Sequence, residues 1–133
     1  MRLIALLLCC AAAAAAEPKA TIAQILYFKA KLGQLEGYNR YIKEIAGPID
    51  EDARKAGAFH SLTTLVNPDP QSPWSHLRLF TFESKEQLAA FSKKMDEAGV
   101  RVFPDEAKRK ANAARIALLR DRVGEAMVAD ILH

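Results

Sequence analysis

The stretch Trp74–Ser84 (WSHLRLFTFES) decides the fold that this sequence predicts. It has the pattern of a β-strand that leads directly into a helix. One face of the expected strand carries polar and aromatic side chains, namely His76, Arg78, Phe80 and Phe82. The other face carries Leu77, Leu79 and Thr81. Because side chains alternate across a strand, both faces present large apolar groups and both need cover.

The end of this stretch has the signature of a helix N-terminus. Ser84 stands three residues before Gln87, and an apolar pattern with helical spacing follows. In such a capping box the serine hydroxyl accepts a backbone N–H while the glutamine side chain reaches back. We therefore expect a helix from about Lys85 to Ala98, with Gly99 as its end.

Residues 1–16 have the order of features found in a secretory signal peptide. Arg2 supplies positive charge, Leu3–Leu8 is apolar, and an alanine run ends at Ala16. This order predicts cleavage after Ala16 and export of the mature protein, which would be periplasmic or secreted. The alternative is an N-terminal segment with no targeting role.

The predicted mature domain, residues 17–133, contains no cysteine. Cys9 and Cys10 both precede it, and a lipoprotein signal fits poorly because neither cysteine follows a small residue. The domain would have no disulfide, no thiolate site and no stable membrane anchor. The formal net charge of +3 falls by one with the loss of Arg2, so it gives no strong attraction to nucleic acid.

Three further strands are expected besides the one within Trp74–Ser84. Residues 21–31 are apolar on both faces, as in a central strand, and residues 58–66 are rich in β-branched and aromatic side chains. Residues 67–73 contain three prolines, which predicts a loop between the second and third strands. Residues 126–132 are expected to form the last strand, with a helix as the alternative.

Two further helical regions are expected. Apolar residues at steps of three and four predict a helix over 35–46, which can restart at Pro48 and end at Gly57. A helix rich in Ala, Lys and Arg is expected from Pro104 to about Arg122, with Gly124 as its end. Its basic residues alternate with alanines and no aromatic groups, which favours a solvated helix face over a nucleic-acid site.

This order of elements defines a fold class. Strand, helix, strand, strand, helix, extra helix, strand is the α+β, ferredoxin-like split βαβ arrangement, with a four-stranded antiparallel sheet and helices on one face. Residues 17–133 would form it as a single domain. The helix-free face would be apolar, and an apolar open face implies a partner. The simplest partner is a second copy of the chain in a two-fold homodimer.

The region from Ile22 to Met95 resembles the dimeric α+β barrel superfamily, which includes antibiotic-biosynthesis-monooxygenase-like and stress-responsive barrel proteins. The resemblance rests on Lys31-Leu32-Gly33 after the first strand, the amphipathic helix, and the stretch 80–86 (FTFESKE). It implies a homodimer whose sheets form a barrel around a small-molecule cavity. The extra helix and the signal peptide depart from the compact members.

The same superfamily contains haem-degrading monooxygenases, which use an Asn on strand one, a Trp on strand three and a haem-ligating His. An alignment on the shared turns places Leu26, Phe82 and Ser92 at these three positions, so that activity is disfavoured. The alignment also implies that one face of the sheet points into the barrel. That face carries Gln24, Leu26, Phe28, His76, Arg78, Phe80 and Phe82.

His76 and Arg78 are the best candidates for a functional site. They share a strand face beside Trp74, where an imidazole could move a proton and a guanidinium could hold a carboxylate or enolate oxygen. The expected ligand-binding set is completed by Gln24, His60, Trp74, Phe80 and Phe82. The alternative is that both groups lie at the solvent end of the strand, or that Arg78 pairs across the dimer.

No cofactor and no metal ion is expected. His60, His76 and Asp130 could form a two-histidine, one-carboxylate set, but no spacing motif supports it. The sequence therefore predicts an exported, dimeric barrel protein that binds a small apolar or aromatic ligand. A cofactor-independent monooxygenase or isomerase activity would be one form of that function. The alternative is a non-catalytic interaction module whose apolar sheet face docks another protein.

Overall fold

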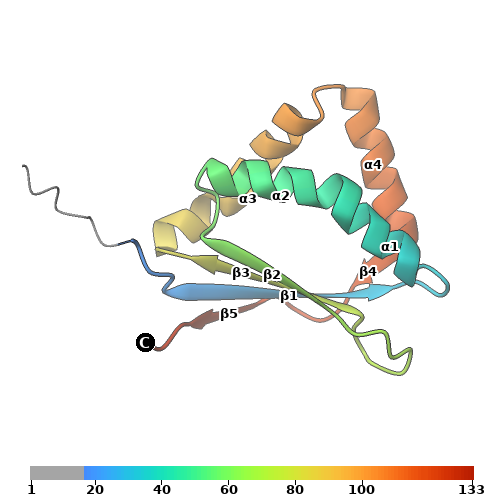
Figure 1. Cartoon of the computed structure of the whole chain (residues 1–133), viewed down its shortest axis with the longest axis horizontal. Helices are drawn as coiled ribbons and strands as arrows, with labels where there is room; N and C mark the ends of the chain where they lie inside the picture. Colours follow the sequence, from blue (N-terminus) through green and yellow to red (C-terminus); the bar gives the residue numbers. More distant parts are fainter. Residues whose placement is uncertain (1–16) are drawn as a thin grey trace, which may run out of the picture.

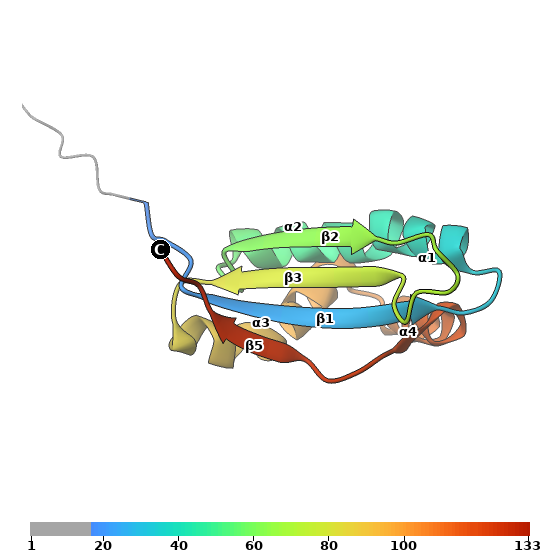
Figure 2. The same ribbon diagram turned by 90° about the horizontal axis from the view of Figure 1, so that it is seen from below.

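A single antiparallel sheet carries all the described helices on one of its faces (Figure 1, Figure 2). The computed structural model describes residues 17–133, so the signal-peptide prediction and both cysteines lie outside the described residues. The first half comprises β1 (Ile22–Ala30), α1 (Leu35–Tyr41), the π-helical turn η1 (Ile42–Ala46), α2 (Gly47–Lys55) and β2 (Ser61–Val66). The second half comprises β3 (His76–Phe82), α3 (Lys85–Val102), α4 (Glu106–Leu119), β4 (Arg120–Arg122) and β5 (Met127–Asp130).

The strand order is that of the ferredoxin-like fold. The sheet runs β2-β3-β1-β4, with β5 also paired to β1, and every pairing is antiparallel. The two apolar strands, β1 and β3, occupy the centre, where Gln24 lies opposite Phe80 and Leu26 opposite Arg78. The α+β, split βαβ prediction is therefore confirmed.

The last strand of the fold is formed in two pieces. β5 pairs with Ile22–Ile25, and β4 pairs with Phe28–Ala30. The prediction of a strand within 126–132 is confirmed, but the preceding helix was predicted too long, because it ends at Leu119. The edge of β1 supplies backbone partners for β4, and Gly124, with φ +68°, lets the chain bend between the two pieces.

Two glycines predicted to interrupt helices do not do so. Gly99 lies inside α3, which continues to Val102, and the Gly99 carbonyl accepts a hydrogen bond from Phe103 N–H. The helical path from Leu35 to Lys55 is unbroken at Gly47, because the π-helical turn η1 joins α1 to α2. Pro48 lacks an N–H to donate, and the irregular turn precedes it.

The hydrophobic core lies between the sheet and helices α2 and α3. Phe80 and Phe82 of β3 pack against Phe91 of α3, with ring centroids 4.8 and 5.2 Å apart, and Phe59 completes the aromatic cluster. Ala53 and Ala98 are fully buried where the two helices meet the sheet. Burial of these rings contributes about 2–3 kcal/mol each to the folding free energy.

This core corrects the orientation expected for the sheet. The face carrying Gln24, Leu26, Phe28, His76, Arg78, Phe80 and Phe82 was predicted to point into a barrel between two sheets, and it lies under the helices instead. Its large rings match the apolar stripe of α3, namely Leu88, Phe91 and Met95. Both strand faces are apolar, so only the helix side chains decide which face they cover.

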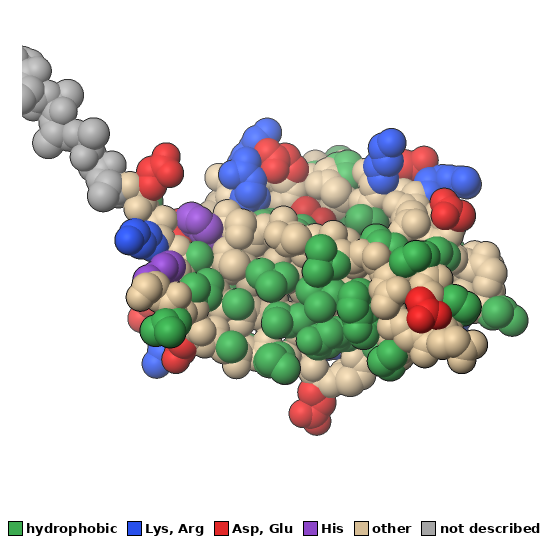
Figure 3. Space-filling view, turned by 60° about the horizontal axis from the view of Figure 1, so that its bottom comes forward, with side chains coloured by type: hydrophobic (Ala, Val, Ile, Leu, Met, Phe, Trp, Pro, Cys, Tyr) green, Lys and Arg blue, Asp and Glu red, His purple; other side chains and the backbone are tan. Residues whose placement is uncertain are grey.

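The opposite face of the sheet has no helix over it in the described chain. Figure 3 shows many apolar side chains gathered on this face, interspersed with other atoms, and charged groups mainly around its edge. The register places Ala23, Ile25, Tyr27, Leu65, Leu77, Leu79 and Met127 on this face, which we call the open sheet face. Leu65 and Met127 are 50% and 51% exposed. The prediction of an apolar open face is confirmed.

A helix that crosses a membrane needs about 20 consecutive, mostly apolar residues. Within residues 17–133, no helix is both long enough and apolar enough to cross a bilayer.

The N-terminus of α3 gives a first test of the fold. Ser84 Oγ accepts Gln87 N–H at 3.1 Å, and Gln87 Oε1 accepts Glu83 N–H at 2.7 Å. Ser84→Ala should lower the free energy of unfolding by about 1 kcal/mol, measured by urea denaturation, because a helix N–H loses its acceptor. Ser92→Ala, at an exposed position of the same helix, is the matched control and should change it by less than about 0.5 kcal/mol. Equal losses would contradict the capping role.

Candidate functional site

A buried ion pair joins the sheet to the helices. Arg78 of β3 donates a hydrogen bond from Nη2 to Asp50 Oδ2 of α2, and both residues are buried. The guanidinium carbon lies 5.1 Å from the centroid of Phe80. Burial raises the pKa of Asp50, and the Arg78 charge opposes this shift. Arg78 Nε is buried and has no acceptor within residues 17–133.

His76 is fully buried next to this pair. Its Nε2 lies 2.7 Å from Asn39 Oδ1, and its Nδ1 lies 2.8 Å from Ser75 Oγ. The amide oxygen of Asn39 can only accept, so Nε2 donates the proton and Nδ1 accepts from Ser75. Burial, together with the positive charges of Arg120 and Arg78, lowers the pKa of His76 to about 4. The imidazole is therefore neutral at neutral pH.

Tyr38 and Arg120 complete the polar cluster. The ring centroids of Tyr38 and His76 are 4.2 Å apart, and the Tyr38 hydroxyl accepts a hydrogen bond from Arg120 Nη1. The guanidinium carbon of Arg120 lies 3.7 Å from the centroid of the Phe28 ring. Burial raises the pKa of Tyr38, and Arg120 opposes the rise. His76 thus supports Tyr38, which in turn positions Arg120.

A cavity of about 360 Å³ opens beside this cluster, between the sheet and α3. We call it the sheet–helix cavity. Its apolar wall is formed by Leu26, Phe28, Phe80, Phe91 and Met95. Its polar groups are Gln24, Ser92, Asp96, Arg78, Arg120 and Arg122. The strand register places the three arginines at one end of the cavity, opposite Leu26, Phe28 and Ala30 of β1, whereas Gln24 and Phe80 lie farther along the sheet.

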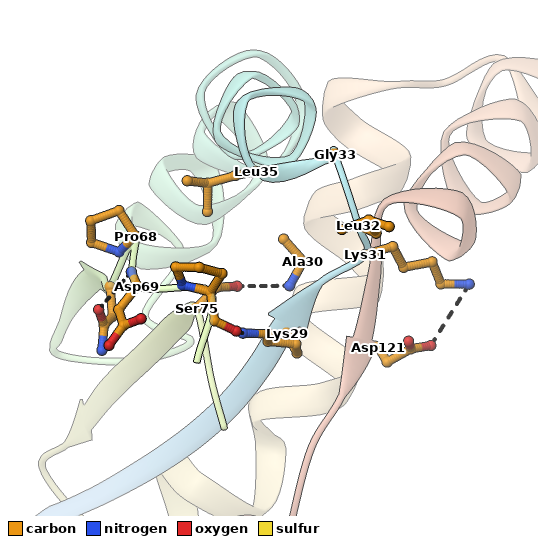
Figure 4. A pocket seen from close by; sticks show the side chains of 12 residues that line it. Lys29, Ala30, Lys31, Leu32, Gly33, Leu35, Pro68, Asp69, Ser75 and Asp121 are labelled. Carbon is orange, nitrogen blue, oxygen red and sulfur yellow. Dashed lines mark hydrogen bonds and ion pairs between the residues drawn. The ribbon is translucent and has the colours of Figure 1, made fainter. Parts of the chain in front are cut away.

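A larger cavity, of about 460 Å³, lies at the rim of the sheet. Figure 4 shows Lys31 and Asp121 pointing toward each other on one side of it, with Nζ and Oδ1 3.8 Å apart. Lys29 Nζ donates to the carbonyls of Pro70 and Ser72 at 3.1 and 2.6 Å. These charged groups already have partners within the protein.

The structure brings together only part of the predicted ligand-binding set. Gln24, Arg78 and Phe80 line the sheet–helix cavity, and His76 lies behind it without lining it. Phe82 belongs to the core and is fully buried. Arg78 pairs within its own chain, with Asp50, and neither His76 nor Arg78 lies at a solvent-exposed strand end.

His60 and Trp74 lie elsewhere. His60 is exposed near the far end of β3, where its Nδ1 is 3.2 Å from Glu83 Oε1. Trp74 packs edge-on against Tyr27, 6.4 Å between centroids. In the described part of the chain no three His, Cys, Asp or Glu side chains are grouped to hold a metal ion, so His60, His76 and Asp130 do not converge.

Sequence reasoning missed four members of the polar cluster: Tyr38, Asn39, Asp50 and Arg120. Tyr38 lies in the helix predicted over 35–46, and Asp50 lies in the segment predicted to restart at Pro48. Arg120 was assigned to a solvated helix. No local signal marked Asp50, because its position opposite Arg78 depends on how α2 packs on β3.

The fold and this cavity define the class: a ferredoxin-like α+β protein with a small cavity between its sheet and its helices. Among solved structures it is similar to a dimeric ferredoxin-like protein from an uncultured marine organism, with a TM-score of 0.61 and 10% identity over 87% of this chain and 91% of that one. It is also similar to HapK from Hahella chejuensis, with a TM-score of 0.57 and 10% identity over 84% of this chain and 92% of that one.

No protein-family model matches the sequence, and no match is found among curated proteins. At these identities the structural likeness shows the fold alone. It confirms the ferredoxin-like fold that the resemblance implied.

The buried imidazole predicts a pH-dependent stability. The pKa of His76 is about 4 in the folded chain against 6.5 for a free imidazole, so the unfolded state binds the proton first as the pH falls. The stability that His76 contributes above pH 6.5 should be lost toward pH 4, by at most about 3 kcal/mol. The difference in unfolding free energy between wild type and His76→Gln should shrink over that range.

Ser92→Ala is the control, because Ser92 is exposed and its side chain does not titrate, and it should show the same pH dependence as wild type. Asp50 is present in all three proteins, so its titration cancels from the comparison. A constant difference between wild type and His76→Gln from pH 7 to pH 4 would contradict the assignment.

Proposed function

We propose that this chain is an exported, homodimeric protein that binds a small apolar or aromatic ligand in the sheet–helix cavity. The observation that carries the proposal is the composition of that cavity, which combines an aromatic wall with a few convergent polar groups. Its volume of about 360 Å³ is at the lower end of the ~300–1,000 Å³ common for small-molecule sites. This size favours a small ligand.

In this proposal Arg78, Gln24 and Phe80 contact the ligand, and His76 is a positioning residue. His76 acts through Tyr38, which holds Arg120 at the cavity. A cofactor-independent monooxygenase or isomerase activity stays a prediction from the resemblance, since it would need a group that exchanges protons with the ligand. Binding is what the geometry favours most directly.

Export is proposed from the order of charge, apolar run and alanines in residues 1–16. The mature protein would then begin at Glu17 and work in the periplasm or outside the cell. The absence of cysteine from residues 17–133 is compatible with either compartment.

The homodimer is proposed from the open sheet face. A surface rich in exposed apolar side chains is unfavourable in water, and a second copy of the chain would cover it through a two-fold axis. The similar marine protein is described as dimeric, which agrees with this arrangement. The alternative is an interaction module that uses the open sheet face for a different protein, and the exposed Leu65 and Met127 are what favour it.

Ligand binding can be tested by native mass spectrometry of protein exported from the full-length gene. We expect a dimer of chains that begin at Glu17, carrying additional small-molecule mass. Ser92→Trp, on the α3 side of the cavity, should reduce the occupied fraction at least fivefold by filling the space. The matched control is Lys93→Trp, because the neighbouring Lys93 side chain is 84% exposed and does not line the cavity.

A dimer with no additional mass, and with no binding of added aromatic probes, would contradict the ligand-binding proposal. An equal loss of bound mass in Ser92→Trp and Lys93→Trp would place the ligand outside the cavity. An uncleaved N-terminus would contradict export.

Dimerisation can be tested with matched substitutions on opposite sides of the molecule. Leu79→Glu puts a carboxylate at the centre of the open sheet face, and each dimer would bury two of them. We expect the dissociation constant, measured by analytical ultracentrifugation, to rise at least 100-fold. Leu118→Glu, on α4 where Leu118 is 72% exposed, should leave the dimer unchanged.

Circular dichroism should show that both variants keep the fold. A wild-type protein that is monomeric at all concentrations would remove the homodimer and favour the interaction module. A dimer whose dissociation constant is unchanged by Leu79→Glu would also contradict a homodimer formed through the open sheet face.

A further inference from the structure

We propose that the ligand of the sheet–helix cavity is an organic anion: an apolar or aromatic body with one acidic group, such as a carboxylate or an enolate. The inference rests on the proposed function, since it names the class of ligand for the same cavity. The acidic group would lie at the end formed by Arg78, Arg120 and Arg122, with the apolar body against the aromatic wall.

The first argument is the balance of charge around the cavity. Three guanidinium groups line it, and one of them, Arg78, is neutralised by Asp50. Within residues 17–133, no carboxylate lies within 4.0 Å of the side-chain nitrogens of Arg120 or Arg122. Asp96 also lines the cavity but forms no ion pair in that part of the chain. The cavity therefore carries uncompensated positive charge.

The second argument is that the protein holds this charge in place. Arg120 is partly buried, its guanidinium carbon lies 3.7 Å from the centroid of the Phe28 ring, and it is tied to Tyr38 by a hydrogen bond. Arg78 and Arg120 both lower the pKa of His76, so the two positive charges act on one neutral imidazole. Arg78 is already paired with Asp50, so a bound anion would mainly compensate the charge of Arg120, which has no carboxylate within 4.0 Å in residues 17–133.

The third argument is the unused hydrogen-bonding capacity. Arg78 is nine-tenths buried, yet its Nε has no acceptor within the described chain. The Gln24 amide, set in an apolar strand, makes no hydrogen bond to any other group in residues 17–133. A guanidinium offers five N–H donors in a planar fork that suits a carboxylate, so an anion would supply the missing acceptors.

A pair of fluorescent probes with the same rings separates charge from shape. 8-Anilinonaphthalene-1-sulfonate carries a sulfonate, which stands in for the acidic group, and N-phenyl-1-naphthylamine is its neutral counterpart. Fluorescence titration of the purified wild-type protein at pH 7 should give a dissociation constant at least tenfold lower for the anionic probe. The preference should weaken as the salt concentration rises.

Arg122→Gln and the double variant Arg120→Gln/Arg122→Gln test which charges give that preference. We expect the double variant to bring the two dissociation constants within threefold of each other, mainly by weakening the anionic probe. Arg122 is exposed, so the single variant should keep the fold and lose part of the preference. Arg54→Gln removes the same charge from the outer surface of α2 and should leave both constants unchanged.

The outcomes separate the two proposals. If both probes bind equally to wild type, and Ser92→Trp weakens both, the cavity binds ligands but the preference for anions is wrong. If neither probe responds to Ser92→Trp, the cavity is not the binding site and the proposed function fails together with the inference. If Arg54→Gln weakens the anionic probe as much as the double variant does, net charge and not the cavity explains the preference.

Discussion

The ion pair between Arg78 and Asp50 is the interaction on which the arrangement of sheet and helices depends. It joins the central strand β3 to α2, and both side chains are removed from water. Two buried charges are tolerated only when they meet, and loss of one partner costs about 3–5 kcal/mol. Asp50 reaches Arg78 because η1 carries the helical path past Gly47 and Pro48 without a break. The face of β3 that carries Arg78 must therefore lie under the helices.

This constraint explains what could be predicted from sequence and what could not. The strands, their order and the apolar open face follow from local alternation, which the stretch Trp74–Ser84 shows plainly. Which face of the sheet the helices cover does not follow from local alternation, because both faces of β1 and β3 are apolar. It is decided by contacts between residues far apart in the chain, such as Arg78 with Asp50 and His76 with Asn39. The candidate residues His76 and Arg78 were chosen for their chemistry, but their buried partners had no local signal.

The end of α4 shows the same competition between local and distant interactions. Residues 120–122 continue a sequence rich in helix-forming residues, yet they pair with Phe28–Ala30 as β4. The unpaired edge of β1 offers backbone partners that another helical turn could not use. Because of this pairing, Arg120 lies over Phe28 and beside Tyr38, at the cavity, and not on a solvated helix.

The two faces of the sheet therefore differ in kind, although both are apolar in sequence. On the open sheet face the strands hold apolar side chains in fixed positions, and the residues that form this face include no buried charge. Such a surface is suited to contact with another protein chain. The other face holds every member of the polar cluster, enclosed by helices of the same chain. A cavity completed within one chain does not need a second copy to supply a contact.

A barrel formed by two sheets would place its ligand between copies, whereas here the groups suited to bind one lie on the far side of each sheet. Under the proposed function, assembly and ligand recognition would depend on different residues, and each could change without the other.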